Sequence, residues 1–446
     1  MKRKKLQEVA LIITLLVSFG LYMGCDDVDD PIVTIPQTVQ ELWDEQTNEL
    51  PYPTSGITTE DRIKGAIMGT MIGDAMGVGC HWYYDFEGLW ADYGTWIDDY
   101  VDPNPNPDAS MRFPDIPKLR YDAGVRGGWN SQSGELIQIL LEVISANTNQ
   151  GANTGNFDAT EYVAAIEDFF DNRLRPAATF DGGQMDGEHI DSLSGRYTNM
   201  AIKENFDAWY NNGAKDGDWS ANDELASTMS TSEPAQFGVI LAALYRDPEA
   251  LAPIAHDFVR IWFSDPAFIS NNFLYIMTVQ AIINGVPLDN LADYIRKYAF
   301  TTFSPYIAGD DFLLPTNTLD MLKRPQLFPF PDDRFVPLMF GHGCHQAHLL
   351  PAAYYFAYKY ADDFKEAILT SVNSAGNNMA RSALAGGLVG AMVGINGIPE
   401  RFINGLANDP LLIPAGSTQS EYLLEMAQDV ADGTNGAIPV FSTPAH

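Results

Sequence analysis

The stretch that decides the fold is DRIKGAIMGTMIGDAMG, residues 61–77, in which a glycine recurs at every fourth position. These glycines are Gly65, Gly69, Gly73 and Gly77. A glycine inside a helix costs about 0.5–1 kcal/mol relative to alanine, so a row of four needs a physical reason. Residues spaced by four lie on one face of a helix, where the missing side chains allow another backbone to come close. We therefore predict a core helix with a glycine ridge.

A second glycine ridge lies near the other end of the chain. The stretch SALAGGLVGAMVG, residues 382–394, repeats the spacing with Gly386, Gly390 and Gly394. Dimerisation of membrane helices is the alternative use of such a ridge. Dimerisation of this kind requires a helix that is long enough to span the membrane, however. The apolar run around the second ridge is too short, and Asp74 interrupts the run around the first ridge. We therefore predict that both helices lie in the protein core, where they can pack against each other.

Helical periodicity dominates the remaining chain, and the alternation typical of strands is nearly absent. Thr58 and Asp61 approximate a capping box that opens a helix running to about Met76. Further helices are predicted at residues 133–147, 158–172, 197–211, 234–245, 249–263, 270–284, 287–299, 348–360, 362–372, 379–395 and 419–431. The proline-rich stretches 100–128 and 303–340 are predicted to be irregular, the second as a lid or a side wall. The predicted fold class is all-α.

The amino-terminal residues predict export. A basic segment, residues 2–5, precedes an apolar stretch of signal-peptide length that runs into Gly24 and Cys25. Four aspartates follow within residues 26–30, a pattern that resembles the surface-export signal of some Gram-negative lipoproteins. We expect cleavage before Cys25 and lipidation of its thiol, which would hold the protein on the outer membrane or cell surface by lipid alone. An ordinary signal peptide or a short anchor, with Cys25 incidental, is the alternative.

This gives three predicted regions: a lipoprotein signal peptide over residues 1–24, an acidic and proline-rich tether over 25–57, and a single helical domain over 58–446. The domain is long enough to bury a large core. Three cysteines cannot form a rich disulfide framework, and Cys80 and Cys344 could be free or paired. The oligomeric state is left open.

The formal net charge of −33 bears on the partners. Such a field repels nucleic acid and anionic membrane surfaces, so we expect neither as a partner. It also disfavours polyanionic ligands, unless a local feature such as a helix N-terminus overcomes it.

The first ridge, with the Gly73-Asp74-Ala75-Met76-Gly77 segment, resembles the opening helix of the ADP-ribosylglycohydrolase superfamily. The second ridge, followed by Gly397-Ile398-Pro399-Glu400-Arg401, resembles the closing motif of the same superfamily. The resemblance covers roughly residues 60–407. It implies an all-α, orthogonal helical globule with a central polar cleft, and hydrolysis of an ADP-ribosyl bond assisted by one or two Mg²⁺ ions.

The chain departs from the superfamily at the metal positions. The Thr-Asp-Asp-Thr motif falls on Asn130, Ser131, Gln132 and Ser133, and the Asp-x-Asp-Thr/Ser motif falls on Asn377, Asn378, Met379 and Ala380. A glutamate of some members aligns with His81. Mg²⁺ prefers carboxylate and water oxygens, and it does not favour the sulfur of methionine. We therefore predict no metal site of the family type and no cofactor, with Mg²⁺ left as a possibility. A divergent branch with eroded metal motifs fits better, because His81-Trp82-Tyr83-Tyr84-Asp85 and Asn378-x-x-Arg381 resemble it.

Catalysis without metal would need an acid and a base. The candidate catalytic residues are Asp74, His81 and Asp85. Asp74 could instead be satisfied by backbone donors or Arg381, and His81 could be a buried structural histidine. The candidate substrate-binding residues are Asn130, Ser131, Gln132, Asn377, Asn378 and Arg381; those at helix starts could instead be plain N-caps.

Three other segments carry side chains that could bind a metal ion or a ring. His342-x-x-His345-x-x-His348 could gather ligands for Zn²⁺, but loop or core histidines are the favoured interpretation. The acidic stretch at residues 181–191 is not a proper EF-hand loop and is expected to be solvated. The aromatic segment at residues 82–100 is mostly core, although an aromatic wall would also suit an adenine or a sugar ring.

The first functional hypothesis is a lipid-anchored hydrolase that cleaves an N- or O-glycosidic, ADP-ribosyl-like bond at the cell surface. The second is a catalytically inactive surface lipoprotein that binds a nucleotide or glycan in the same cleft. The third is a structural surface protein that uses only the fold. The expected partner is a small-molecule, ADP-ribosyl or glycan ligand.

Overall fold

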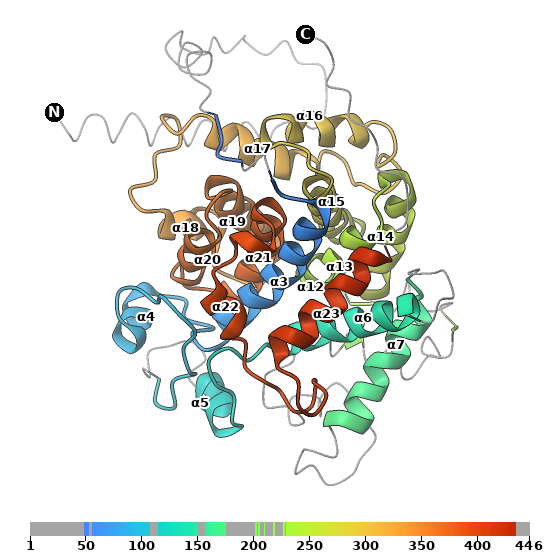
Figure 1. Cartoon of the computed structure of the whole chain (residues 1–446). Coiled ribbons are helices and arrows are strands. Elements are labelled where there is room, and N and C mark those ends of the chain that lie inside the picture. The colour runs from blue at the N-terminus through green and yellow to red at the C-terminus, as the bar shows by residue number, and fades with distance from the viewer. Residues whose placement is uncertain are drawn as a thin grey trace, which may run out of the picture. The chain divides into compact units, whose positions relative to one another are not determined.

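The two glycine ridges belong to helices that lie in backbone contact, α3 (Thr59–Val78) and α21 (Asn378–Val393) (Figure 1). A Cβ atom placed on Gly69 would lie 2.2 Å from the Gly386 carbonyl oxygen. One placed on Gly73 would lie 2.0 Å from the Ser382 carbonyl oxygen. Because no side chain fits at these points, the prediction that the ridges pack against each other is confirmed. The capping box of Thr58 and Asp61 is confirmed as well.

The computed structural model describes residues 49–52, 56–107, 115–149, 157–174 and 229–433, and isolated residues between 201 and 227. Within these ranges the regular secondary structure is helical, and one isolated bridge joins Ser227 to Phe263. The all-α class is therefore confirmed. The predicted signal peptide, Cys25, most of the tether, the acidic stretch 181–191 and most of the predicted helix 197–211 lie outside the described residues.

Most predicted helices are present with shifted ends. They are α6 (Gln132–Asn149), α7 (Ala159–Asp168), α14 (Pro248–Trp262), α15 (Pro266–Ile283), α16 (Leu288–Ala299), α19 (Gln346–Lys359), α20 (Phe364–Val372) and α23 (Gln419–Asp432). The prediction over 158–172 was wrong at its end, because the chain continues from α7 into a π-helical segment, Phe169–Leu174. Short helices add α4 (Phe86–Tyr93), α5 (Asp115–Asp122) and α22 (Glu400–Asn404).

Two predicted helices end or break at a glycine. The single helix expected over 234–245 is two helices, α12 (Glu233–Phe237) and α13 (Val239–Leu244). At the break, a Cβ on Gly238 would lie 2.2 Å from Ile276 Cδ1 of α15, so this glycine allows α15 to approach. The helix expected over 379–395 ends at Val393, because Gly394 takes a φ of 69° and caps it. Gly394 is therefore the C-cap of α21, and it still packs against the first ridge, because a Cβ atom on Gly65 would lie 2.7 Å from its carbonyl carbon.

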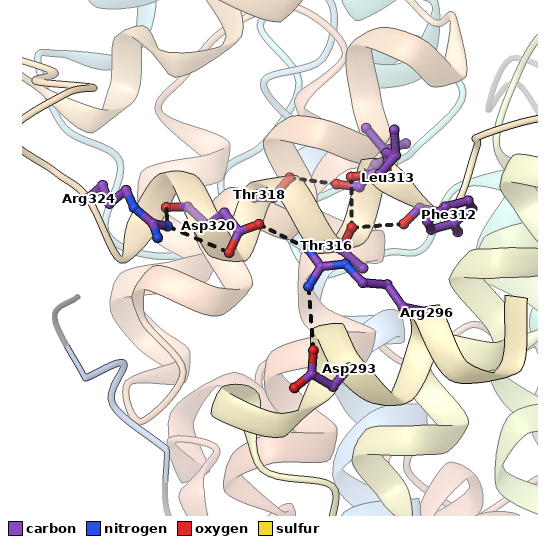
Figure 2. Close-up of polar contacts among 9 residues, drawn as sticks. Asp293, Arg296, Phe312, Leu313, Thr316, Thr318, Asp320 and Arg324 are labelled. Carbon is purple, nitrogen blue, oxygen red and sulfur yellow. Dashed lines mark hydrogen bonds and ion pairs between the residues drawn. The ribbon is translucent and has the colours of Figure 1, made fainter. Parts of the chain in front are cut away.

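The stretch 303–340, predicted to be irregular, contains α17 (Leu313–Leu322), a 3-10 turn (Asp333–Phe335) and α18 (Val336–Phe340). The prediction failed because Pro315 and Pro337 lie in first turns, where a missing N–H costs no helical hydrogen bond. Figure 2 shows how α17 joins α16: Arg296 bonds to Asp320 at 3.0 Å and to Asp293 at 3.5 Å.

Among the described helices, α15 is long and apolar enough to cross a membrane. Its apolar window is 78% buried inside the protein, and it packs against α13, α14 and α21. We therefore interpret α15 as a core helix.

Candidate functional site

Asp74 joins α3 to the start of α6. The Ser131 backbone N–H donates to Asp74 Oδ2 at 2.7 Å, and the Ser131 hydroxyl donates to Oδ1 at 2.6 Å. The Asn130 amide donates to Oδ2 at 3.1 Å and to the Met71 carbonyl at 2.8 Å. Ser131 Oγ also accepts from the N–H groups of Ser133 and Gly134, so it caps α6 while it holds the carboxylate.

The Asp74 carboxyl is fully buried, and burial raises its pKa. The hydrogen bonds from Ser131 and Asn130 and the charge of Arg120 act in the opposite direction. Arg381, the partner considered from the sequence, binds elsewhere: its guanidinium donates to the carbonyls of Ser371 and Ala375, both at 2.7 Å. Asp74 is thus satisfied by the α6 cap, and this contact fixes the position of the Asn130–Ser131–Gln132 turn.

His81 joins the residues after α3 to the start of α21. Its Nδ1 lies 3.3 Å from Asn378 Oδ1. The Asn378 amide nitrogen faces the carbonyls of Cys80 and Val372, so its oxygen must accept from the histidine. This hydrogen bonding places the proton on Nδ1 and leaves Nε2 as the basic nitrogen. Burial and the charges of Arg120 and Arg381 lower the pKa of His81 well below its usual value, so the ring is neutral at pH 7.

This shift predicts a pH effect on stability. Because the folded His81 resists protonation while the unfolded one titrates near pH 6.5, the stability it contributes is present above pH 6.5 and is lost as the pH falls. The free energy of unfolding of the wild type should therefore decline as the pH falls from 7.5 to 5. We expect His81→Gln to reduce this decline by up to about 1.4 kcal/mol per pH unit. Chemical denaturation across that range measures it. His256→Gln, on α14, is the control; an equal flattening there would contradict the assignment.

The other predicted residues lie as follows. Asn377 caps α21 by accepting from the Ala380 N–H at 3.3 Å. Gln132 is buried in the first turn of α6. Arg381 is fully buried, and burial lowers its pKa to about 9. Asp85 is exposed and caps α4 by accepting from the Gly88 N–H at 2.6 Å. The structure therefore brings Asp74 to Asn130 and Ser131, and His81 to Asn378, while Asp85 serves a separate helix.

Glu233 is a candidate that sequence analysis missed. It is only 3% exposed at the start of α12, and its Oε2 atom has no hydrogen-bond partner among the residues that the structure describes. Burial raises its pKa, against the effect of Thr231 and nearby backbone N–H groups. Helix α12 packs against both α6 and α21. In the sequence, Glu233 is a glutamate that precedes a proline at the start of a predicted helix. Because acidic residues are common in the first turn of ordinary helices, this pattern does not mark a site residue.

Cys344 links Glu233 to the predicted segments. Burial raises the pKa of its thiol, and so does the charge of Glu233. Interactions with the side chains of Asn377, Trp82 and Tyr84 act against this rise. Cys80 and Cys344 are both free thiols. Cys344 is thus affected both by Glu233 and by Asn377, and the helix that carries Glu233 packs against α21.

The residues at the family's metal positions do not fit a magnesium ion. Six of the eight carry amides or hydroxyls, the other two are Met379 and Ala380, and both oxygens of the neighbouring Asp74 already accept protein hydrogen bonds. Within the part of the chain that the structure describes, no three His, Cys, Asp or Glu side chains come together as metal ligands. Of the three spaced histidines, His342 faces the Tyr84 carbonyl. His345 caps α19, and its ring centroid lies 5.5 Å from that of His348.

Among the pockets that the described residues form, one has a volume of about 350 Å³ and another about 310 Å³. Neither is lined by a predicted site residue. The first is lined by Thr95, Trp96, Asp332, Asp333, Arg334, Tyr360, Glu366 and Thr370. It is called the Trp96 pocket below.

Comparisons with known proteins agree with the fold. The sequence model of the ADP-ribosylglycohydrolase family matches residues 55–438. No curated protein matches the chain. A solved structure titled "ADP-ribosylglycohydrolase-related protein complex" is similar in fold, with a TM-score of 0.52 and 16% identity, over 84% of this chain and 99% of that one. Because the family match spans most of the sequence, this chain belongs to the ADP-ribosylglycohydrolase family.

Proposed function

We propose that the chain is a hydrolase of the ADP-ribosylglycohydrolase type that cleaves an N- or O-glycosidic, ADP-ribosyl-like bond without the family's magnesium centre. The observation that carries the proposal is the meeting of three segments far apart in sequence. Asp74 ties α3 to the start of α6 through Ser131, and His81 ties the end of α3 to the start of α21 through Asn378. Family membership supports a hydrolase of this type.

The proposed chemistry uses an acid and a base. Glu233, a buried carboxyl with an unpaired oxygen, donates a proton to the leaving group. His81, neutral with Nε2 as its basic nitrogen, accepts the proton of the attacking water. Asp74 holds the Asn130–Gln132 turn in place. Asp85 is the second candidate acid.

Substrate binding is proposed at the starts of α6 and α21. Gln132 and Asn377 offer amides for ribose hydroxyls, whereas the amides of Asn130 and Asn378 are taken up by Asp74 and His81 and hold the two helix starts in place. Arg381 stabilises the turn before α21 through the carbonyls of Ser371 and Ala375. The N-termini of these long helices attract phosphate, which offsets the repulsion from the net charge.

A ligand-binding protein without turnover is the second candidate. It is favoured by the state of Asp74, the acid of the opening motif, whose oxygens are both occupied by protein donors in a fully buried position. A carboxylate held in this way is suited to fixing a binding turn rather than to exchanging protons.

The experiment is an assay of free ADP-ribose released from arginine-linked and serine-linked ADP-ribosyl peptides, with EDTA or with Mg²⁺. The hydrolase predicts release that EDTA does not reduce. The binding protein predicts no release but a raised unfolding midpoint in the presence of ADP-ribose. If ADP-ribose is not released and does not raise the unfolding midpoint, both candidate functions are refuted.

We also propose that Cys25 carries a lipid that holds the protein at the cell surface. The basic residues 2–5, the apolar stretch and the Gly24-Cys25 pair support this. Metabolic labelling with an alkyne fatty acid tests it. Label incorporation that persists in Cys25→Ser would refute lipidation at this residue.

A further inference from the structure

The Trp96 pocket lies apart from the contacts of Asp74 and His81 and has the chemistry of a binding site. Its volume of about 350 Å³ suits a small ligand, and an aromatic ring and several polar groups converge in it. Trp96 is 40% exposed, unusual for so large an apolar side chain.

Arg334 holds the wall of this pocket in place. Its guanidinium lies 5.6 Å from the Trp90 ring centroid and 5.8 Å from that of Trp96, within the range of cation–π attraction. It also donates to the Thr95 carbonyl at 2.8 Å and forms an ion pair with Asp332 at 2.6 Å. Because several contacts fix Arg334, the exposed Trp96 ring is preorganised and loses little entropy when a ligand stacks on it.

Asp333 also lines the pocket and is held by several partners. Its carboxylate accepts from Tyr355 at 3.0 Å, from Lys359 at 2.6 Å and from the hydroxyl of Tyr360. Glu366 is different. Within the part of the chain that the structure describes, its carboxylate accepts one side-chain hydrogen bond, a long contact of 3.4 Å from Thr370, so it keeps acceptor capacity for a ligand.

The charges of the pocket decide which ligands it accepts. Three carboxylates line it; Arg334 neutralises Asp332 and Lys359 neutralises Asp333, so the charge of Glu366 is left over. A phosphate or carboxylate ligand would be repelled, whereas hydroxyl groups can donate to Glu366. A ring with an apolar face and several hydroxyls satisfies both the tryptophan and the carboxylate.

We propose that the Trp96 pocket binds a neutral sugar ring, which stacks on Trp96 and donates a hydroxyl hydrogen bond to Glu366. This site is separate from the proposed reaction, and neither depends on the other.

Isothermal titration with four neutral disaccharides (cellobiose, maltose, lactose and chitobiose), and with glucose 1-phosphate, tests the proposal. We expect saturable binding of at least one disaccharide, weakened about tenfold or more in Trp96→Ala, which corresponds to about 1.4 kcal/mol. Glu366→Gln removes the charge with little change of shape and is expected to weaken binding severalfold, which keeps the test decisive if Trp96→Ala does not fold. Phe300→Ala removes an exposed aromatic ring elsewhere and should leave affinity unchanged. Absence of binding to all four disaccharides, undiminished affinity in both pocket variants, or equal affinity for glucose 1-phosphate would overturn the proposal.

Discussion

Replacing Gly69 with alanine is expected to destabilise the protein by about 4 kcal/mol or more, or to prevent folding. In an isolated helix the same change would stabilise by about 1 kcal/mol, because alanine has the higher helix propensity. Here the new Cβ atom would lie 2.2 Å from the Gly386 carbonyl oxygen and 3.1 Å from a ring carbon of Phe364. Since the first obstacle is backbone, no rotamer change relieves it, and the two central helices must separate.

Urea denaturation followed by circular dichroism measures the change. Gly416→Asn is the matched control, because that glycine has a φ of 93° with no atom within 4 Å of the added Cβ, and asparagine tolerates that conformation. We expect the control to shift stability by about 0.5 kcal/mol or less. Wild-type stability in Gly69→Ala would show that the two backbones are not in contact.

Replacing Glu233 with glutamine is expected to lower kcat by about 100-fold or more, with KM nearly unchanged, if the chain is the hydrolase proposed above. Glutamine keeps the shape of the side chain but cannot donate an acidic proton. Folding should not suffer, because the change removes a carboxyl that burial already disfavours in its charged form. Initial rates of ADP-ribose release and unfolding midpoints measure both effects.

The pH profile gives an independent check. Burial raises the pKa of Glu233, and a general acid must be protonated, so wild-type activity should fall as the pH rises through that pKa. This decline of activity at high pH, the basic limb of the profile, should disappear in Glu233→Gln. Glu249→Gln, an exposed glutamate in the first turn of α14, should keep both the rate and the limb. If Asp85→Asn loses the activity and Glu233→Gln keeps it, the acid is Asp85.

The sequence predicted the site only in part. The segments around Asp74, Asn130 and Asn378 could be found because glycine spacing and family motifs mark them locally. Glu233 could not be found, because its importance comes from burial and an unpaired oxygen, properties that packing creates. The Trp96 pocket was also unpredictable, since Trp96, Arg334 and Glu366 come from three distant stretches.

The sequence alone determined the all-α class, the two core helices and the family, because helical periodicity and the four-residue glycine spacing are local properties of the chain. Tertiary structure decided which backbone packs against each glycine ridge. It also decided that the predicted helix over 234–245 breaks at Gly238, where Ile276 packs, and that Ser131 rather than Arg381 binds Asp74. The physical reason is that a hydrogen bond or a close backbone contact between distant residues depends on how whole helices pack. Helix packing is set by the sum of many contacts, which no single motif contains.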